Sequence, residues 1–381
     1  MDFDLTDEQR TLQQTIRDFA ERHLTPGARE RDRDGELSLD LWRRCADIGL
    51  TGLTVTPEYG GQGADALTAV IALEALGHGC RDNGLVFSLN AHLWSAAMPI
   101  ERFGSDAQKE RWLRPLVDGT SIGVQAMTEP DSGSDAFALR TSAEVHEGGF
   151  VLNGTKTYIT NAPVADVFVV FASTDPDRGW AGITAFLVDR SLPGVDVGPP
   201  FDKLGLHTSP MGEIHFDDVV VDADAVLGRV GGGLLVFDHS MEWERGCVLA
   251  SAVGSMQYQL ERSAVYARTR EQFGTHIGAF QAVSHRVVDM QVRVEAARLL
   301  LYRMAWRRAK GERVAEDAAL VKLFVSESWV ESSLDHLRIH GAYGYMSESG
   351  VEADVRDSLA SRIYSGTSDI QRNILARGLR L

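Results

Sequence analysis

The hydrophobic and polar positions along this chain change their spacing twice. Between residues 6 and 118 the apolar side chains recur every three or four positions, which is typical of amphipathic helices. From residue 121 to about residue 228 the period is two, as in VFVVFAST and EIHFDDVVV, and Gly, Pro and Asp turns separate the segments. After the three glycines at 231–233 the helical spacing returns and lasts almost to residue 381.

These changes predict an α+β fold with three domains. We expect an N-terminal helical domain over residues 1–120, a middle antiparallel β domain over 121–230 and a C-terminal helical bundle domain over 231–381. The glycines at 231–233 lack the strand-then-helix context of a dinucleotide fingerprint, so we interpret them as a flexible domain junction.

Composition narrows the classes of partner and location. The 54 acidic and 38 basic residues give a net charge of -16, which argues against nucleic acid as the main partner. Cys45, Cys80 and Cys247 are far apart and odd in number, so we expect no disulfide framework and no Cys-x-x-Cys metal site. The polar N-terminus does not resemble a signal peptide and no apolar run reaches membrane-span length, so we expect a cytoplasmic protein without membrane contact.

Several familiar catalytic motifs are absent from the sequence. It contains no HExxH, no P-loop, no EF-hand loop and no GxSxG elbow. The eleven histidines are scattered, and a lone histidine is more often packed or capped than a metal ligand. We therefore expect no metal site.

One candidate for acid–base chemistry is HSMEWERGCVLASAVGSM, residues 239–256, where Glu242, Glu244 and Arg245 border an apolar run. Acidic residues in a first helical turn complement the helix dipole and stay solvated. A carboxylate at the edge of an apolar cavity is instead a good general base, because desolvation raises its pKa toward the working pH. The local pattern leaves both interpretations open and favours the solvated one.

Six segments together carry a family resemblance. The loop at 126–135 is rich in backbone N–H groups and hydroxyls, so it could bind a phosphate or simply be a surface turn. In order and spacing, the chain resembles the acyl-CoA dehydrogenase family at PEYGGQG (57–63), AMTEPDSGSD (126–135), NGTKTYITN (153–161), DKLGLHTS (202–209), TREQFGTHIGAFQ (269–281) and IYSGTSDIQR (363–372). The resemblance implies FAD bound between the β domain and a four-helix bundle, across a subunit contact of a homotetramer.

The resemblance also implies which residues bind FAD. The flavin ring is expected against Met127, Thr128, Tyr158 and Thr160, and the pyrophosphate near Gly133 and Ser134. Arg270, Phe273 and Gln281 are expected to reach the FAD of a neighbouring subunit, and Thr367 and Asp369 follow from the Gly-Thr turn. Arg338 and Ala342 depart from the family's more common Gln and Gly.

The family comparison also indicates where the catalytic base lies. Many members carry the base immediately before the Gly-Thr turn, where this chain has Ser365, and a serine without an adjacent base is too weak to remove a carbon-bound proton. Isovaleryl-type members carry the glutamate on a bundle helix before an arginine, which matches Glu244 and Arg245. The resemblance implies that Glu244 removes the α-proton while the β-hydrogen leaves as hydride to the flavin. The Ser365 N–H and a flavin ribityl hydroxyl would stabilise the enolate oxygen. Glu242, two residues away, is expected to be structural.

Three further segments resemble one branch of the family, the L-prolyl carrier-protein dehydrogenases of pyrrole-forming antibiotic biosynthesis. They are ALGHGCRDNGLVFSLNAHLW (75–94), SMEWERGC (240–247) and SRIYSGTSDIQ (361–371). This branch implies oxidation of L-prolyl-S-carrier protein toward pyrrolyl-2-carboxyl-S-carrier protein. The alternatives are a short- or branched-chain, isovaleryl-type dehydrogenase acting on acyl-CoA, and an inactive flavin- or acyl-binding scaffold. His207 stands where CoA users often carry arginine, which leans against CoA.

The acyl pocket and the electron acceptor are less specified by sequence. Asn90, His92, Trp94 and Trp243 could line the pocket together with Arg245, although large aromatic residues usually serve burial first. A substrate with a secondary amine would need a polar partner, and Asn90 or His92 could be that partner. The reduced flavin could be reoxidised by an electron-transfer flavoprotein or by oxygen.

Overall fold

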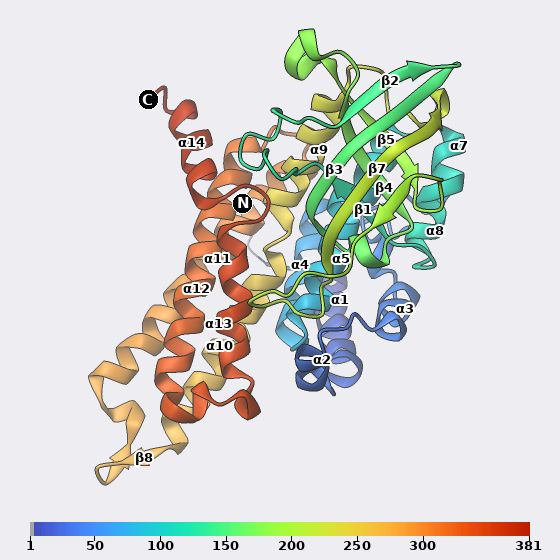
Figure 1. Ribbon diagram of the computed structural model, residues 1–381. Helices are drawn as coiled ribbons and strands as arrows, with labels where there is room; N and C mark the ends of the chain where they lie inside the picture. The colour runs from blue at the N-terminus through green and yellow to red at the C-terminus, as the bar shows by residue number, and fades with distance from the viewer. Residues whose placement is uncertain (1–3) are drawn as a thin grey trace.

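The computed structural model describes residues 4–381, and its N-terminal part is helical (Figure 1). Threonine, serine or aspartate side chains cap several of these helices, as where Asp65 accepts the Thr68 N–H. The helices are α1 (Asp7–Phe19), α2 (Ala28–Asp34), α3 (Leu39–Asp47), α4 (Ala66–Gly79), α5 (Asn83–His92), α6 (Met98–Phe103), α7 (Asp106–Gln108) and α8 (Arg114–Val117). Helix α4 is apolar on nearly all sides and almost wholly buried, because α1 packs on one side of it and the C-terminal helices on the other.

Three π-helical turns interrupt this part: η1 (Ala20–Leu24), η4 (Leu93–Ala97) and η5 (Lys109–Leu113). A π turn inserts one residue into the helical register and is often found at functional sites. The turn η4 joins α5 to α6 without a break and changes which side chains face the C-terminal helices. The sequence pattern did not predict these turns, because one extra residue disturbs a helical period very little.

The middle part is a seven-stranded sheet in the order β1-β4-β2-β3-β7-β6, with β5 paired to β4. Its strands are β1 (Gly123–Ala126), β2 (Ser142–His146), β3 (Gly149–Thr160), β4 (Val167–Ser173), β5 (Ile183–Asp189), β6 (Val195–Val197) and β7 (Met211–Asp222). The sheet differs from the predicted antiparallel one, because β1 runs parallel to β4 and β2 meets β4 in a parallel bridge. Alternating hydrophobicity indicates which face a residue occupies but not the direction of the strand.

The C-terminal part contains four long helices, α9 (Gly233–Cys247), α10 (Ala250–Thr269), α11 (Gln281–Ala309) and α12 (Ala315–Tyr345), followed by α13 (Val351–Leu359) and α14 (Ser368–Gly378). A small hairpin of β8 (Glu271–Gln272) and β9 (Thr275–His276) projects from the far end of this bundle (Figure 1). Gly341 kinks α12 near its end with a φ of 60°. The predicted α+β fold is confirmed, and the predicted boundaries at 120 and 230 fall in the connections before β1 and before α9.

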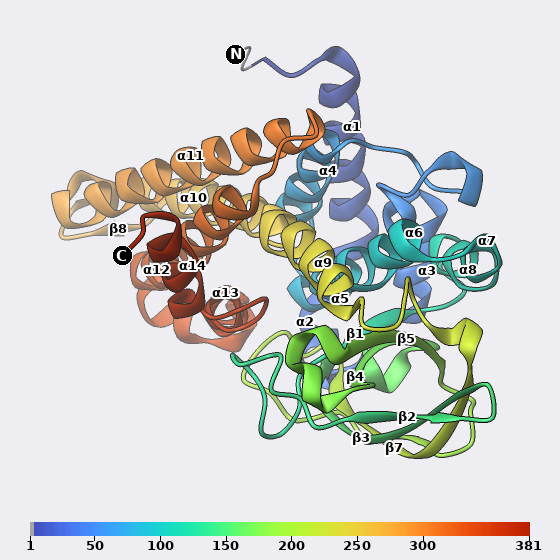
Figure 2. The ribbon, with the colours of Figure 1, turned by 90° about the horizontal axis from the view of Figure 1, so that it is seen from above.

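Two glycines allow the helical parts to pack closely. A Cβ on Gly77 of α4 would lie 1.9 Å from the Ser251 carbonyl oxygen, and one on Gly254 of α10 would lie 1.9 Å from the Glu74 carbonyl oxygen. This close crossing of α4 and α10 fixes the N-terminal helices against the bundle. Seen from above, α9 lies in the centre of the molecule, where the N-terminal helices, the bundle and the sheet meet (Figure 2).

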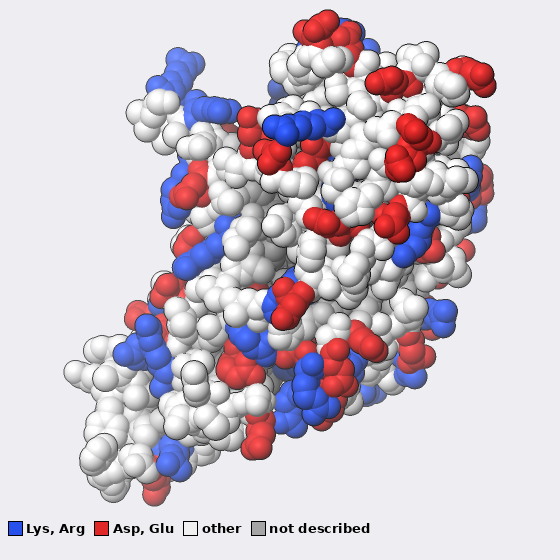
Figure 3. Space-filling model, in the orientation of Figure 1, with Lys and Arg blue, Asp and Glu red and all other residues white. Residues whose placement is uncertain are grey.

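The surface carries both signs of charge. On the face shown in Figure 3, acidic and basic side chains are interspersed over the bundle and the sheet. Within residues 4–381, none of the helices combines the length and the apolar composition that crossing a bilayer requires.

Candidate active site

The Glu244 carboxylate is the point at which three distant segments meet. Its Oε1 accepts a hydrogen bond from the Ser365 hydroxyl at 2.5 Å, and its Oε2 accepts one from the Ser95 hydroxyl at 2.9 Å. Ser95 comes from the π turn η4, and Ser365 comes from the segment between α13 and α14. Glu244 lies in the last turn of α9, where the helix dipole disfavours a carboxylate. The interpretation of Glu244 as a solvated first-turn residue is therefore wrong.

The surroundings of Glu244 set its pKa in two opposing ways. Burial raises the pKa of the Glu244 carboxyl above its ordinary value. The two serine hydrogen bonds and the charges of Arg245 and Lys322 oppose this shift, because they favour the ionised form. Within residues 4–381 Glu244 has two hydroxyl donors and no direct ion pair, and such a desolvated carboxylate is suited to accept a proton near neutral pH.

Ser365 is held in an unusual backbone conformation. Its φ is 57°, a left-handed value that non-glycine residues rarely adopt, and Gly366 follows at 87°. The Ser365 carbonyl accepts hydrogen bonds from Arg245 Nε and Gln371 Nε2, each at 3.2 Å. Among residues 4–381, no acceptor is paired with the Ser365 N–H. This N–H is therefore available to a developing oxyanion.

The residues predicted to hold the flavin ring come from two strand ends that the fold brings together. Met127 and Thr128 follow β1, and Tyr158 and Thr160 end β3. The Thr157 N–H donates to the Thr128 carbonyl at 2.9 Å, which joins the two segments. Tyr158 has a φ of 56° and is 63% exposed, so its ring is available to a planar partner.

A buried ion pair beneath this edge fixes its backbone. Lys156 is fully buried, and its Nζ donates to the Met127 carbonyl at 3.0 Å and to Glu129 Oε1 at 2.8 Å. Glu129 also accepts the Thr141 hydroxyl at 2.6 Å. Because both charges are satisfied internally, we assign the pair a structural role in shaping the loop.

The loop that follows fits the predicted pyrophosphate site. Gly133 and Ser134 are exposed, and a Cβ added to Gly133 would meet no atom within 4 Å. Packing within this chain therefore does not require glycine at 133, whereas close approach by a ligand would.

Three residues predicted to contact FAD lie far from Glu244, around the hairpin at the far end of the bundle (Figure 1). Arg270 ends α10, Phe273 forms the hairpin turn and is 95% exposed, and Gln281 begins α11. The structure does not bring these residues to the Met127–Tyr158 edge of the same chain. At the other predicted position, Thr367 caps α14 through the Ile370 N–H, while the exposed Asp369 pairs with Arg372 at 2.8 Å.

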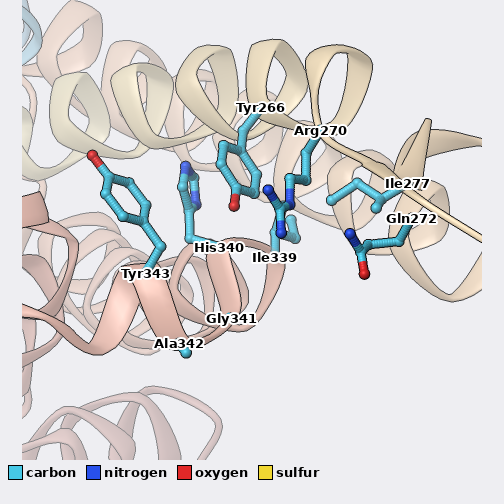
Figure 4. Close-up of a pocket in the computed structure, with 9 residues that line it drawn as sticks. All are labelled: Tyr266, Arg270, Gln272, Ile277, Ile339, His340, Gly341, Ala342 and Tyr343. Carbon is cyan, nitrogen blue, oxygen red and sulfur yellow. The ribbon is translucent and has the colours of Figure 1, made fainter.

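Arg270 also borders a cavity of about 520 Å³ between α10 and the kink of α12. The rings of Tyr266, His340 and Tyr343 lie in a row along it (Figure 4). Tyr266 and His340 stack with their centroids 4.3 Å apart. Such an aromatic wall beside an arginine can bind a heteroaromatic anion.

The predicted acyl-pocket residues have mainly packing roles. His92 is fully buried, its Nδ1 accepts the Gly123 N–H at 3.1 Å and its Nε2 lies 3.2 Å from the Leu116 carbonyl oxygen. Burial lowers the pKa of His92 to about 4, so the ring is neutral. Since neither ring nitrogen is free, the prediction that His92 could meet a substrate amine is wrong.

Asn90 and the tryptophans form a second packed group. Asn90 is fully buried, donates to the Val86 carbonyl at 2.9 Å and accepts the Trp94 indole N–H at 2.9 Å. The Trp94 and Trp243 rings stack with centroids 5.3 Å apart. Trp243 directly precedes Glu244 in α9 and Trp94 directly precedes Ser95 in η4, so the stack joins the two elements that hold the carboxylate.

Arg308 covers the outer face of Trp243, at 3.8 Å from its ring, and its Nη1 pairs with Glu242 Oε1 at 2.5 Å. The expectation that Glu242 is structural agrees with this ion pair.

Ser95 and Lys322 belong to the site although the sequence reasoning missed them. Ser95 lies in an apolar run and carries no local signal. Lys322 sits among buried α12 residues at helical spacing, and a lysine on a buried face was a signal that could have been followed.

Three family models match the chain: the acyl-CoA dehydrogenase N-terminal domain over residues 6–120, the middle domain over 124–219 and the C-terminal domain over 231–380. The L-prolyl-[peptidyl-carrier protein] dehydrogenase of Serratia sp. is 42% identical over 381 residues, covering 100% of this chain and 99% of the relative. The solved prolyl acyl carrier protein oxidase AnaB has a TM-score of 0.98 at 41% identity, covering 99% of this chain and 100% of its own. PigA with FAD and proline has a TM-score of 0.98 at 41% identity, covering 100% of both chains. This chain therefore belongs to the acyl-CoA dehydrogenase family.

Proposed function

We propose that this protein is an FAD-dependent dehydrogenase that oxidises an L-prolyl group held as a thioester on a carrier protein, toward the pyrrolyl-2-carboxyl thioester. The single observation that carries the proposal is the Glu244 carboxylate, held between Ser95 and Ser365 in a partly buried site. The full-length similarity to the Serratia dehydrogenase, to AnaB and to PigA supports the choice of substrate.

A side chain of this protein supplies the base, and a backbone N–H supplies the oxyanion donor. Glu244 accepts the α-proton of the thioester, and its two serine partners keep the carboxylate oriented during the transfer. The Ser365 N–H donates to the thioester oxygen as negative charge develops there. Bound FAD supplies the acceptor for the β-hydrogen.

FAD binding in this proposal uses two copies of the chain. Met127, Thr128, Tyr158 and Thr160 would hold the flavin ring, and Gly133 and Ser134 would approach the pyrophosphate. The hairpin residues of a second copy, together with Thr367 and Asp369, would complete the site within a homotetramer; these hairpin residues are Arg270, Phe273 and Gln281. The extreme exposure of Phe273 supports such a contact, because a free phenylalanine side chain gains nothing from water.

The main alternative substrate is an isovaleryl-type acyl-CoA, which shares the position of the base. His207 does not separate the two substrates, since its Nδ1 lies 3.1 Å from Asp32 Oδ1 and its Nε2 lies 2.8 Å from the Lys203 carbonyl oxygen. It is part of an internal contact between the N-terminal helices and the β-domain loop. An inactive scaffold is the remaining alternative, and the two hydroxyl donors on Glu244 argue against it.

Anaerobic bleaching of the visible flavin band tests the substrate. The FAD-loaded enzyme is mixed either with L-prolyl-loaded peptidyl carrier protein or with isovaleryl-CoA, using unloaded carrier protein as the control. Bleaching by the prolyl carrier alone is expected. Bleaching by isovaleryl-CoA alone would make the protein a branched-chain acyl-CoA dehydrogenase, and bleaching by neither would favour a scaffold. Admitting air after bleaching, with and without an electron-transfer flavoprotein, identifies the electron acceptor.

A further inference from the structure

Lys322 of α12 is a fully buried lysine close to the base. Its Nζ donates to the Ser361 carbonyl at 2.5 Å and lies 5.4 Å from the centre of the Tyr364 ring. Ser361 and Tyr364 belong to the segment that presents Ser365 to Glu244. In the part of the chain from residue 4 onward, Lys322 forms no ion pair within 4.0 Å.

A buried ammonium without a counter-charge is strongly unfavourable, so the negative charge that balances Lys322 must lie nearby. Two carboxylates act on it, Glu244 and Glu327. Glu327 is already engaged, by Arg362 at 2.7 Å and by the Ser368 hydroxyl at 2.7 Å. Glu244 has hydroxyl donors but, among the residues that the structure describes, no cation at ion-pair distance. Lys322 and Glu244 are therefore complementary charges that contact the same segment, Lys322 at Ser361 and Glu244 at Ser365.

We propose that Lys322 is a positioning residue of the dehydrogenation: its ammonium anchors the Ser361–Ser365 segment and adds, to that of Arg245, positive charge that favours the ionised form of Glu244. This inference rests on the proposed role of Glu244 as the base. It assigns to α12 a part in the chemistry, although Lys322 touches neither the substrate nor the cofactor in the proposed arrangement.

Glu244 is faced by Arg245 of its own helix, by the hydroxyls of Ser95 and Ser365, by the Tyr364 ring and by Lys322. Arg245 is in turn balanced partly by Asp238, so its charge is shared between two carboxylates. Burial lowers the pKa of Lys322 to about 8, which leaves it charged over the neutral range.

The pH profile of FAD-loaded Lys322→Met tests the proposal. The rate of flavin bleaching by L-prolyl carrier protein is measured across pH for the wild type and the variant. The acidic limb of this pH–rate profile reports the protonation of Glu244. Without the ammonium, the limb should move upward by about 1 pH unit, the lower end of the pKa shift that an opposite charge causes in a neighbouring carboxyl. The rate should recover at higher pH, and an acidic limb that does not move overturns the proposal.

Arg362→Met is the matched control. Arg362 anchors the same segment to α12, through Glu327 at 2.7 Å and Glu331 at 3.5 Å, but it does not act on Glu244. This variant should lower the rate without moving the acidic limb. If it moves the limb as far as Lys322→Met does, loosening of the segment accounts for the effect and the charge role is wrong.

A second measurement keeps the proposal testable if Lys322→Met does not fold. In Glu244→Gln, Lys322 loses its balancing charge and should release its proton at lower pH than in the wild type. The unfolded chain then binds more protons than the folded one, so stability rises with pH. Between about pH 7 and pH 8 the thermal midpoint of Glu244→Gln should therefore rise relative to the wild type. A difference in thermal midpoint that stays constant with pH contradicts the coupling between Lys322 and Glu244. Failure of the proposed function would give a different result, because the prolyl carrier protein would then not bleach the flavin of the wild-type enzyme.

Discussion

At the scale of single residues, the site combines a glutamate from a helix, which supplies the carboxylate, with a serine from a loop, which orients that carboxylate. Ser365 occupies the place where many family members carry the base, and here its hydroxyl donates to Glu244. Its left-handed backbone keeps the N–H free for the thioester oxygen. The Gly-Thr turn thus keeps its backbone role while the carboxylate comes from α9.

Ser365→Ala tests this division. Loss of a hydrogen bond to a charged group costs about 1.5–3 kcal/mol, so the acidic limb of the bleaching rate should rise by about 1–2 pH units. Activity at higher pH should be largely retained, because the alanine keeps the backbone N–H. Ser368→Ala, which loses only its bond to Glu327 at 2.7 Å, is the control. Abolished activity at every pH would contradict the account of Ser365.

The residue scale also shows what the sequence could and could not predict. The local pattern around Glu244 favoured a solvated carboxylate, and only the family resemblance, through the Glu244–Arg245 pair, predicted its place in the site. The Ser95 hydroxyl could not be predicted, since the π turn that aims it depends on packing against α9. The prediction that His92 could contact a substrate amine was wrong for a related reason, because its two hydrogen-bond partners are backbone groups of distant segments.

At the scale of elements, the crossing of α4 and α10 holds the acyl-pocket helices against the bundle. Gly77 and Gly254 meet the opposite backbone at distances that exclude any side chain. Hydrophobic spacing predicted that both regions are helical, but it could not predict this crossing, and it did not indicate that β1 runs parallel to β4. Helix periods are local, whereas crossings and strand directions are set by the whole chain.

Gly254→Ala should be strongly destabilising. The added Cβ would lie 1.9 Å from the Glu74 carbonyl oxygen and 2.5 Å from the His78 backbone nitrogen, so α4 must move. Overpacking of this kind costs about 1–3 kcal/mol or more, and the thermal midpoint should fall by several degrees. At Gly198 the nearest atom would be 3.8 Å away, so Gly198→Ala is the control and should leave the midpoint unchanged. Equal midpoints for both variants would disprove the close crossing.

At the scale of the whole molecule, the predicted FAD residues fall into two groups that one chain does not join. One group lies at the β1–β3 edge and the other at the hairpin beyond the bundle. The family resemblance anticipated a second subunit, whereas hydrophobic patterning alone could not, because an exposed phenylalanine looks the same in sequence as a buried one.

Phe273→Ser tests the second copy. Phe273 is 95% exposed and its ring centroid lies 6.0 Å from that of Phe280, so the substitution should not disturb the fold of one chain. We expect reduced retention of FAD during gel filtration and a shift toward smaller assemblies. Val145→Ser, at a position 79% exposed on β2, should change neither. Full FAD retention with an unaltered assembly in Phe273→Ser would contradict the shared site.

The central claim is that Glu244 is the base, and Glu244→Gln tests it most directly. The amide keeps the size of the side chain but cannot take a proton, so bleaching by L-prolyl carrier protein should slow by about 10²–10⁴-fold, the usual contribution of a general base. The flavin absorbance of the purified variant should remain that of the wild type. Slow bleaching with bound FAD is the result that this account predicts; a variant that binds FAD and bleaches at the wild-type rate would contradict it.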